Sequence, residues 1–195
     1  MTATETSIST TPTGPKRADA RRNRERVLVA AREAFATGGE STALEEIARR
    51  AGVGIGTLYR HFPTRQALLE ALYVKEVEEV CRSAGQPGDV DPWHAFNGWC
   101  ERLISYLATK RALAGELLNY LDADAPLFKE CRSGLYTAGE PLLKRAQDAG
   151  VVRPDVEFSH VMQMVVGISK IPSDPAQIEH ILRIALDGLR YQRPA

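Results

Sequence analysis

TALEEIARRAGVGIGTLYRHFPTRQALL, residues 42–69, is the stretch that decides the fold of this chain. Thr42 followed by Glu45 has the spacing of a capping box, which predicts that a helix begins at Thr42. Gly52 can adopt the left-handed conformation that ends a helix, and we expect it to end this one. A second, short helix is predicted over residues 55–61. Two helices joined by so tight a turn form a helix-turn-helix.

The second of these helices has one face suited to DNA. If Leu58 points inward, the helical step of about 100° places Gly56 and Arg60 on the solvent side. Thr57 and Tyr59 then flank that side, and Ile55 and His61 lie nearer the core. A small, polar and cationic face is what a helix needs in order to lie in the major groove.

The motifs in this stretch resemble those of the tetracycline-repressor (TetR) family. The family pattern combines a Thr-capped I-A-x-x-A-G-V helix with a G-T-L-Y-x-H-F helix, and here these are residues 47–53 and 56–62, with a basic residue at Arg65. The resemblance covers about residues 20–72. It departs from the family at Gly54, where many members have Ser or Thr, and at Arg65, where Lys is usual.

The resemblance implies a homodimer that binds double-stranded operator DNA and responds to a small-molecule effector. Of the residues that it assigns to DNA binding, Arg60 is the one expected to read a base and Arg65 the one expected to clamp the backbone. For His61, packing at the helix end is an equally good interpretation. The residues so assigned are Thr42, Ile55, Gly56, Thr57, Tyr59, Arg60, His61 and Arg65.

The rest of the chain predicts an all-α protein, because Gly and Pro divide it into helix-length segments without alternating strand patterns. We expect a disordered arm over residues 1–15, a helix-turn-helix domain over 16–63 and a ligand-binding and dimerisation domain over 64–195. Predicted helices outside the motif cover 18–37, 64–84, 93–110, 112–121, 126–149, 156–168 and 175–191, with a turn-rich break at 85–92.

The predicted C-terminal domain has two surplus apolar features. Its last two helices, within residues 156–191, are apolar nearly all round, which favours a subunit interface. Aromatic residues elsewhere suggest a pocket for an apolar or aromatic effector, although ordinary core packing explains any single one of them. The candidate pocket residues are Trp99, Leu103, Tyr106, Tyr120, Phe128, Tyr136 and Met162.

Charge and composition leave few other functions open. The net charge is zero, but residues 1–75 hold 12 basic against 8 acidic residues. The arginines at positions 21, 22, 24 and 26 suit either a phosphate strand or a solvated helix start. No apolar signal core or membrane-length segment is present, so we expect a cytoplasmic protein. Its three cysteines are widely spaced and fit neither a disulfide framework nor a CxxC metal site, which favours a reducing compartment.

Two alternative functions are an enzyme and a thiol redox sensor. An enzyme is disfavoured because the sequence has no HExxH, no GxSxG and no phosphate-binding glycine loop, and neither a cofactor nor a metal is predicted. A thiol redox sensor would need a cysteine of low pKa, and only Cys131, beside Lys129 and Arg132, has basic neighbours.

Overall fold

The computed structural model describes residues 15–38, 42–85 and 90–190, and its described elements are helices. Their bounds are α1 Pro15–Gly38, α2 Leu44–Ala51, α3 Ile55–His61, α4 Arg65–Ser83, α5 Pro92–Leu117, α6 Pro126–Asp148, α7 Phe158–Ser169 and α8 Pro175–Asp187. An isolated bridge between Val152 and Arg190 is the one β-type pairing within these ranges. The all-α prediction is confirmed.

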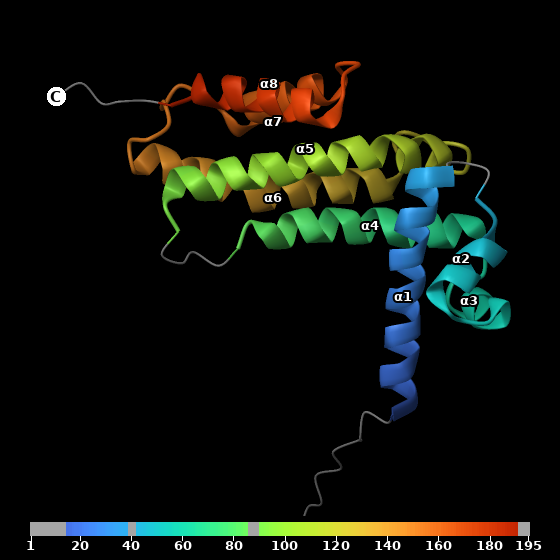
Figure 1. The fold of residues 1–195 in the computed structure, drawn as a ribbon. Coiled ribbons are helices and arrows are strands. Elements are labelled where there is room, and N and C mark those ends of the chain that lie inside the picture. Colours follow the sequence, from blue (N-terminus) through green and yellow to red (C-terminus); the bar gives the residue numbers. More distant parts are fainter. Residues whose placement is uncertain (1–14, 39–41, 86–89, 191–195) are drawn as a thin grey trace, which may run out of the picture.

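The helices form a small head joined to a larger body (Figure 1). Helices α4, α5 and α6 lie side by side, and α7 and α8 cover the side of α5 away from α4. Helix α1 stands across the end of this stack, with α2 and α3 beside it. Because α4 packs against α5 and α6 and also contacts α1, it connects the head to the body.

Local capping explains most of the helix ends. Gly52 has a φ of 62° and ends α2 in the left-handed conformation, as predicted. The Thr64 hydroxyl accepts a hydrogen bond from the Ala67 amide at 3.0 Å, and the Asp174 carboxylate accepts one from Gln177 at 2.9 Å. These two caps fix where α4 and α8 begin.

Helix α2 does not begin as the capping-box spacing predicted. Its N-cap is Ala43, which has no side-chain hydrogen bond to the helix. The buried Thr42 hydroxyl instead donates to the carbonyl of Ala34 in α1, at 3.1 Å. The Thr42 hydroxyl therefore has a tertiary partner in α1 that the capping-box spacing did not predict.

Three predicted boundaries in the body also need correction. The predicted break at residue 111 is absent, and α5 continues to Leu117 because no proline interrupts it. Helix α7 begins at Phe158 rather than at 156, and α8 ends at Asp187. Residue 191 and the predicted arm up to residue 14 lie outside the described residues.

Among the described residues, none of the helices combines the length and the apolar character needed to cross a membrane.

Candidate nucleic-acid interface and ligand cavity

The angle between α2 and α3 is fixed by a short turn and by buried apolar side chains. After Gly52 reverses the chain, the Val53 amide donates to the carbonyl of Ala48 at 3.0 Å and closes the turn. Leu58 of α3 is fully buried, and Ile47 of α2 lies in the same core. Burying a leucine stabilises the folded state by about 2 kcal/mol, which is enough to set which face of α3 points outward.

The exposure of α3 agrees with the helical step at Gly56 and Arg60 but not at Ile55, which the step places nearer the core. Ile55 is 38% exposed and Tyr59 is 43% exposed, while Gly56 and Arg60 are also exposed. The two remaining predicted residues of this helix, Thr57 and His61, are half-buried. The structure therefore places these six residues on or beside one solvent-facing surface, which we call the α3 face.

Two glycines on this surface are not required by packing. A Cβ atom built on Gly54 or on Gly56 would meet no atom within 4 Å, and neither residue has a positive φ. Nothing inside the protein therefore explains why side chains are missing here. Their absence leaves the backbone open to close approach by a binding partner.

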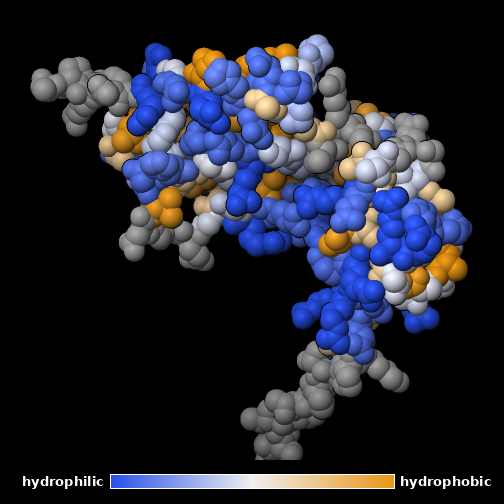
Figure 2. Space-filling model, in the orientation of Figure 1, coloured by the Kyte–Doolittle hydropathy of each residue, from blue (hydrophilic) through white to orange (hydrophobic). Residues whose placement is uncertain are grey.

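Helix α1 adds cationic side chains to the head. Its projecting end is strongly hydrophilic in Figure 2. Arg24 stacks over the ring of Phe62 at 5.3 Å, and Arg26 donates to the carbonyl of Gly52 at 3.4 Å. Arg22 pairs with Asp19. Arg21 is exposed, so the four arginines differ in how far the protein itself engages them.

A cavity of about 780 Å³ lies in the body between α4, α5, α6 and α7. Cavities of roughly 300–1,000 Å³ are typical of small-molecule sites. Four of the predicted pocket residues line it, namely Tyr106, Phe128, Tyr136 and Met162. Their contact with a ligand remains a prediction.

Two models of known protein families match this chain. Residues 27–72 match the family model described as bacterial regulatory proteins, tetR family. Residues 91–191 match the model described as transcriptional regulator SbtR-like, C-terminal domain. The chain belongs to the TetR family of transcriptional regulators. As a TetR-family protein it is a DNA-binding regulator and not an enzyme.

Solved structures and curated relatives resemble this TetR-family chain over most of its length. The TetR transcriptional regulator SCO0520 from Streptomyces coelicolor is 37% identical, with a TM-score of 0.77, covering 87% of this chain and 99% of its own. A TetR regulatory protein from Mycobacterium vanbaalenii is 35% identical, with a TM-score of 0.74, covering 90% and 99%. The regulator UidR of Escherichia coli K12 is 24% identical over 158 residues, 77% of this chain and 80% of UidR.

A further relative matches about a third of this chain. The transcriptional repressor KstR of Rhodococcus jostii is 37% identical over 67 residues, which are 33% of this chain and 32% of KstR.

Arg65 contacts residues of both the head and the body. Its guanidinium bonds to the carboxylate of Glu116 in α5 at 2.5 Å and donates to the carbonyl of Thr42. It also stacks over Phe35 at 5.0 Å. The Arg65 side chain is 21% exposed and that of Glu116 is 6% exposed. A buried carboxylate from the body holds this arginine at the junction between the head and the body, so a phosphate contact of Arg65 stays a prediction.

Thr42 is likewise withdrawn from the expected DNA surface. It is buried, and its hydroxyl proton is directed at Ala34 rather than outward, where a phosphate oxygen would need a donor. Thr42 and Arg65 instead contact each other at the junction between the head and the body.

Three predicted pocket residues do not line the cavity. Trp99 is buried, packs against Phe158 at 5.7 Å between ring centroids and donates its indole N–H to the Val80 carbonyl at 3.2 Å. Leu103 is fully buried in the core. Tyr120 is 45% exposed in the connection that follows α5. Helical periodicity marks such residues as apolar but does not separate a cavity wall from ordinary core.

The cavity also has lining residues that the sequence did not single out. Tyr73 from α4 lies edge-on to Phe128 at 5.3 Å, and the burial of Tyr106 beside Tyr73 raises the pKa of the Tyr106 phenol. Arg132 of α6 and Lys170 at the end of α7 are charged members of the wall. The only hint in the sequence was the basic neighbourhood of Cys131.

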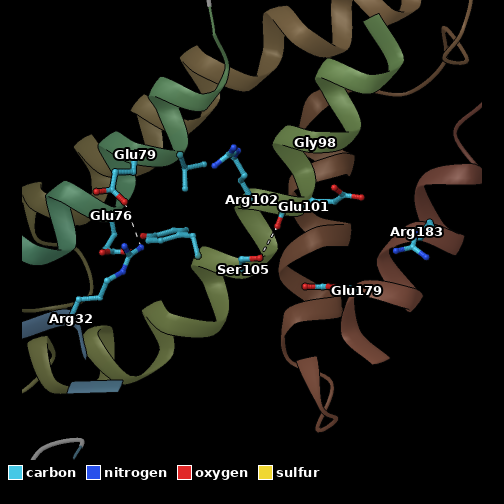
Figure 3. Close-up of a pocket in the computed structure, with 11 residues that line it drawn as sticks. Arg32, Glu76, Glu79, Gly98, Glu101, Arg102, Ser105, Glu179 and Arg183 are labelled. Atoms are coloured by element: carbon cyan, nitrogen blue, oxygen red, sulfur yellow. Dashed lines mark hydrogen bonds and ion pairs between the residues drawn. The ribbon is translucent and has the colours of Figure 1, made fainter. Parts of the chain in front are cut away.

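A second cavity, of about 640 Å³, is bounded by charged residues of α1, α4, α5 and α8 (Figure 3). Arg32 of α1 pairs with Glu76 at 2.6 Å and with Glu79 at 3.5 Å, both on α4. Burial raises the pKa of Glu76 despite the arginine. This cavity brings acids and bases together and was not predicted.

Two of the three cysteines of this regulator, Cys81 and Cys100, do not favour redox sensing. Burial raises the pKa of Cys81 and, much further, that of Cys100. A raised pKa lowers the thiolate fraction, and thiolate is the form that reacts with oxidants. In the described ranges, no three His, Cys, Asp or Glu side chains are grouped as a metal site would need.

Proposed function

We propose that this TetR-family protein is a repressor that binds a palindromic operator as a homodimer and leaves it when an apolar or aromatic small molecule fills the α4–α7 cavity. In this proposal residues 16–63 bind DNA, residues 64–195 bind the effector and the second subunit, and the protein acts in the cytoplasm. The observation that carries it is the α3 face, which exposes polar and cationic groups over a core anchored by Leu58.

The residues of the α3 face have unequal roles in this proposal. Arg60 is exposed and takes no part in an ion pair within the described residues, so its guanidinium can pair with the O6 and N7 atoms of guanine. Thr57 and Tyr59 flank Arg60 and suit phosphate contacts. Ile55, Gly56 and His61 complete the surface against the groove. The relative KstR, a repressor that matches a third of this chain, supports repression rather than activation.

The homodimer is supported by apolar surface on the last two helices. Ile184 of α8 is 60% exposed and Ile171, which follows α7, is 38% exposed. Ile178 and Ile181 are only half-buried on α8. Hydrophobic residues come to the surface at the top of Figure 2, where α7 and α8 lie. Pairing α7 and α8 of two subunits into a four-helix bundle would bury this surface.

Effector control is supported by the connection between cavity and head. Tyr73 lines the cavity from α4, and α4 begins at Arg65, which bonds to Glu116 of α5. A ligand that fits only one arrangement of α4 against α5 shifts the population toward that arrangement. Effector and operator must then weaken each other's binding by the same factor, typically 5- to 150-fold.

The test of the proposed function is selection of binding sites from a pool of random duplexes. A homodimer presenting two α3 helices should enrich an inverted repeat whose half-sites are centred about one helical turn, ~34 Å, apart. Enrichment of a single unrepeated half-site would contradict the dimeric proposal, and failure to enrich any sequence would contradict specific DNA binding.

The subunit interface has a separate test. Ile184→Asp places a charge in the proposed interface and should convert the dimer to a folded monomer in analytical ultracentrifugation. Val90→Asp is the matched control, because Val90 is 57% exposed but lies outside α7 and α8. A dimer that survives Ile184→Asp unchanged would place the interface elsewhere.

A further inference from the structure

We propose that the effector is an organic carboxylate, with its apolar body inside the α4–α7 cavity and its carboxylate at the rim between Arg132 and Lys170. This inference rests on the proposed function, since it names the chemical class of the effector. It is carried by the charges around the cavity and by the contrast with the second cavity.

The charged residues of the cavity wall are all cationic. Arg132 stands on α6 and Lys170 at the end of α7, so they contribute from two different walls. Among the residues that the structure describes, no aspartate or glutamate lines this cavity. Within the described residues neither cation forms an ion pair, and both side chains are exposed at the rim. Two cations without a protein carboxylate are available for an anionic ligand.

The charged cavity of Figure 3 has the opposite character. Three arginines and four glutamates line it, and Arg32 is already bonded to Glu76 and Glu79. An anion entering there would meet carboxylates as well as guanidinium groups, and like charges repel. The absence of acids around the α4–α7 cavity is therefore a specific feature of that cavity.

The interior of the α4–α7 cavity suits the other end of such a ligand. Phe128, Leu135 and Met162 supply apolar and aromatic surface. Burying a carboxylate among them would cost several kcal/mol, because a charge needs water or a counter-charge. The carboxylate is therefore expected at the rim, where Arg132 and Lys170 lie and where the ligand head keeps part of its hydration.

The position of the cations predicts a salt-sensitive preference. Exposed ion pairs contribute little singly, about 0.2–1 kcal/mol, so two of them favour a carboxylate over the matching alcohol by about 2- to 30-fold. The Debye length falls from about 30 Å at 0.01 M salt to about 3 Å at 1 M, so the preference should decline over that range. Taking the ratio of carboxylate to alcohol cancels the effect of salt on the apolar body.

The experiment measures binding of two matched probe pairs to the full chain by calorimetry: decanoate with decanol, and 4-phenylbutyrate with 4-phenylbutanol. In at least one pair the carboxylate should bind the native protein about twofold or more tightly at low salt. The double variant Arg132→Gln/Lys170→Gln should bring this ratio close to one. It should leave binding of the alcohol unchanged.

The matched control is Lys129→Gln/Lys144→Gln, which removes the same charge from exposed positions of α6 that do not line the cavity. It should retain the carboxylate preference. The inference is overturned if each alcohol binds as tightly as its carboxylate, or if both double variants lower the preference equally.

The outcomes separate this inference from the proposed function. If an alcohol binds, releases operator DNA and matches its carboxylate in affinity, the carboxylate inference fails and the proposed effector control stands. If neither member of either pair binds, the cavity loses its role as an effector site and both proposals for it fail, while operator binding by the α3 face is unaffected.

Discussion

The head and the body of this TetR-family regulator position their functional residues by different means. In the head, a turn at Gly52 and the buried Leu58 orient the whole α3 face, and both lie in the one stretch of residues 42–69. In the body, the cavity wall draws on four helices, from Tyr73 to Lys170. Local contacts therefore determine the α3 face, whereas contacts between distant segments determine the cavity.

Arg60 and Arg65 show this difference within one short segment. Arg60 is exposed on α3, whereas Arg65 is held by Glu116, 51 residues away on α5. The first arginine is available to DNA and the second joins the head to the body.

The largest expected effect comes from breaking the junction. Arg65→Ala should lower the free energy of unfolding by about 3 kcal/mol, because it leaves the carboxylate of Glu116 buried without the arginine. Urea unfolding at a fixed protomer concentration measures the change. Arg60→Ala is the matched control and should stay within about 0.5 kcal/mol of the native chain. Equal stability of the two variants would show that Arg65 is not structural.

The next effect tests close packing in the body. A Cβ on Gly139 would collide with the rings of Phe158 and Trp99, so Gly139→Ala should destabilise the protein by about 1–3 kcal/mol. At Gly134, on the same helix, the added atom would meet only the Cys81 sulfur, at 3.7 Å. Gly134→Ala should therefore be neutral or stabilise by up to about 1 kcal/mol. Thermal unfolding measures the stability of both variants. Equal losses of stability in Gly139→Ala and Gly134→Ala would contradict this account of α6.

A similar substitution tests the turn of the head. Gly52→Ala forces a side chain into the left-handed region and displaces the Arg26 guanidinium, which should cost about 1–2 kcal/mol. Because the turn orients α3, operator affinity should fall as well. Fluorescence anisotropy measures operator affinity. If Gly52→Ala lost stability but kept full operator affinity, the turn at Gly52 would not be what orients α3.

The smallest effects are two pH dependences of opposite sign. In the head, hydrogen bonds from Arg49 and Arg50 lower the pKa of Glu46 from 4.5 to about 2. Its stabilising contribution is complete above pH 4.5 and is lost as the pH falls toward 2. Glu46→Gln should therefore flatten the acid side of a stability–pH curve.

At the edge of the second cavity the sign reverses. Burial raises the pKa of Glu76, so the folded state holds its proton more tightly than the unfolded state does. The stability associated with the protonated form is complete below pH 4.5 and is lost as the pH rises through the folded-state pKa. Relative to Glu76→Gln, the native chain should lose stability as the pH rises above 4.5, and a parallel pair of curves would contradict this.

Sequence patterns predicted what depends on neighbours along the chain. The bounds of α3, the left-handed Gly52 and the inward Leu58 all follow from spacing over a few residues. The sequence did not predict that Arg65 turns inward, because Glu116 lies far along the chain and nothing in the motif reveals it. The family pattern even favoured the opposite role for this basic residue.

The cavity was predicted only in part for the same reason. Tyr106 and Met162 were identified as apolar residues on candidate faces and do line it. Trp99 belongs to the same helix as Tyr106, but α7 packs against it and places it in the core. Which of two apolar residues faces a cavity depends on the helix opposite, and one helix period cannot determine it.

The most direct test of the central claim is the ratio of affinities of Arg60→Ala for the selected operator and for a duplex of scrambled sequence, measured by anisotropy at one salt concentration. If the exposed Arg60 reads a base, the operator should lose about 1–3 kcal/mol of binding free energy and the scrambled duplex much less, so the ratio should fall by about 5- to 150-fold. Equal losses on both duplexes would contradict the account, since Arg60 would then contact only the phosphate backbone.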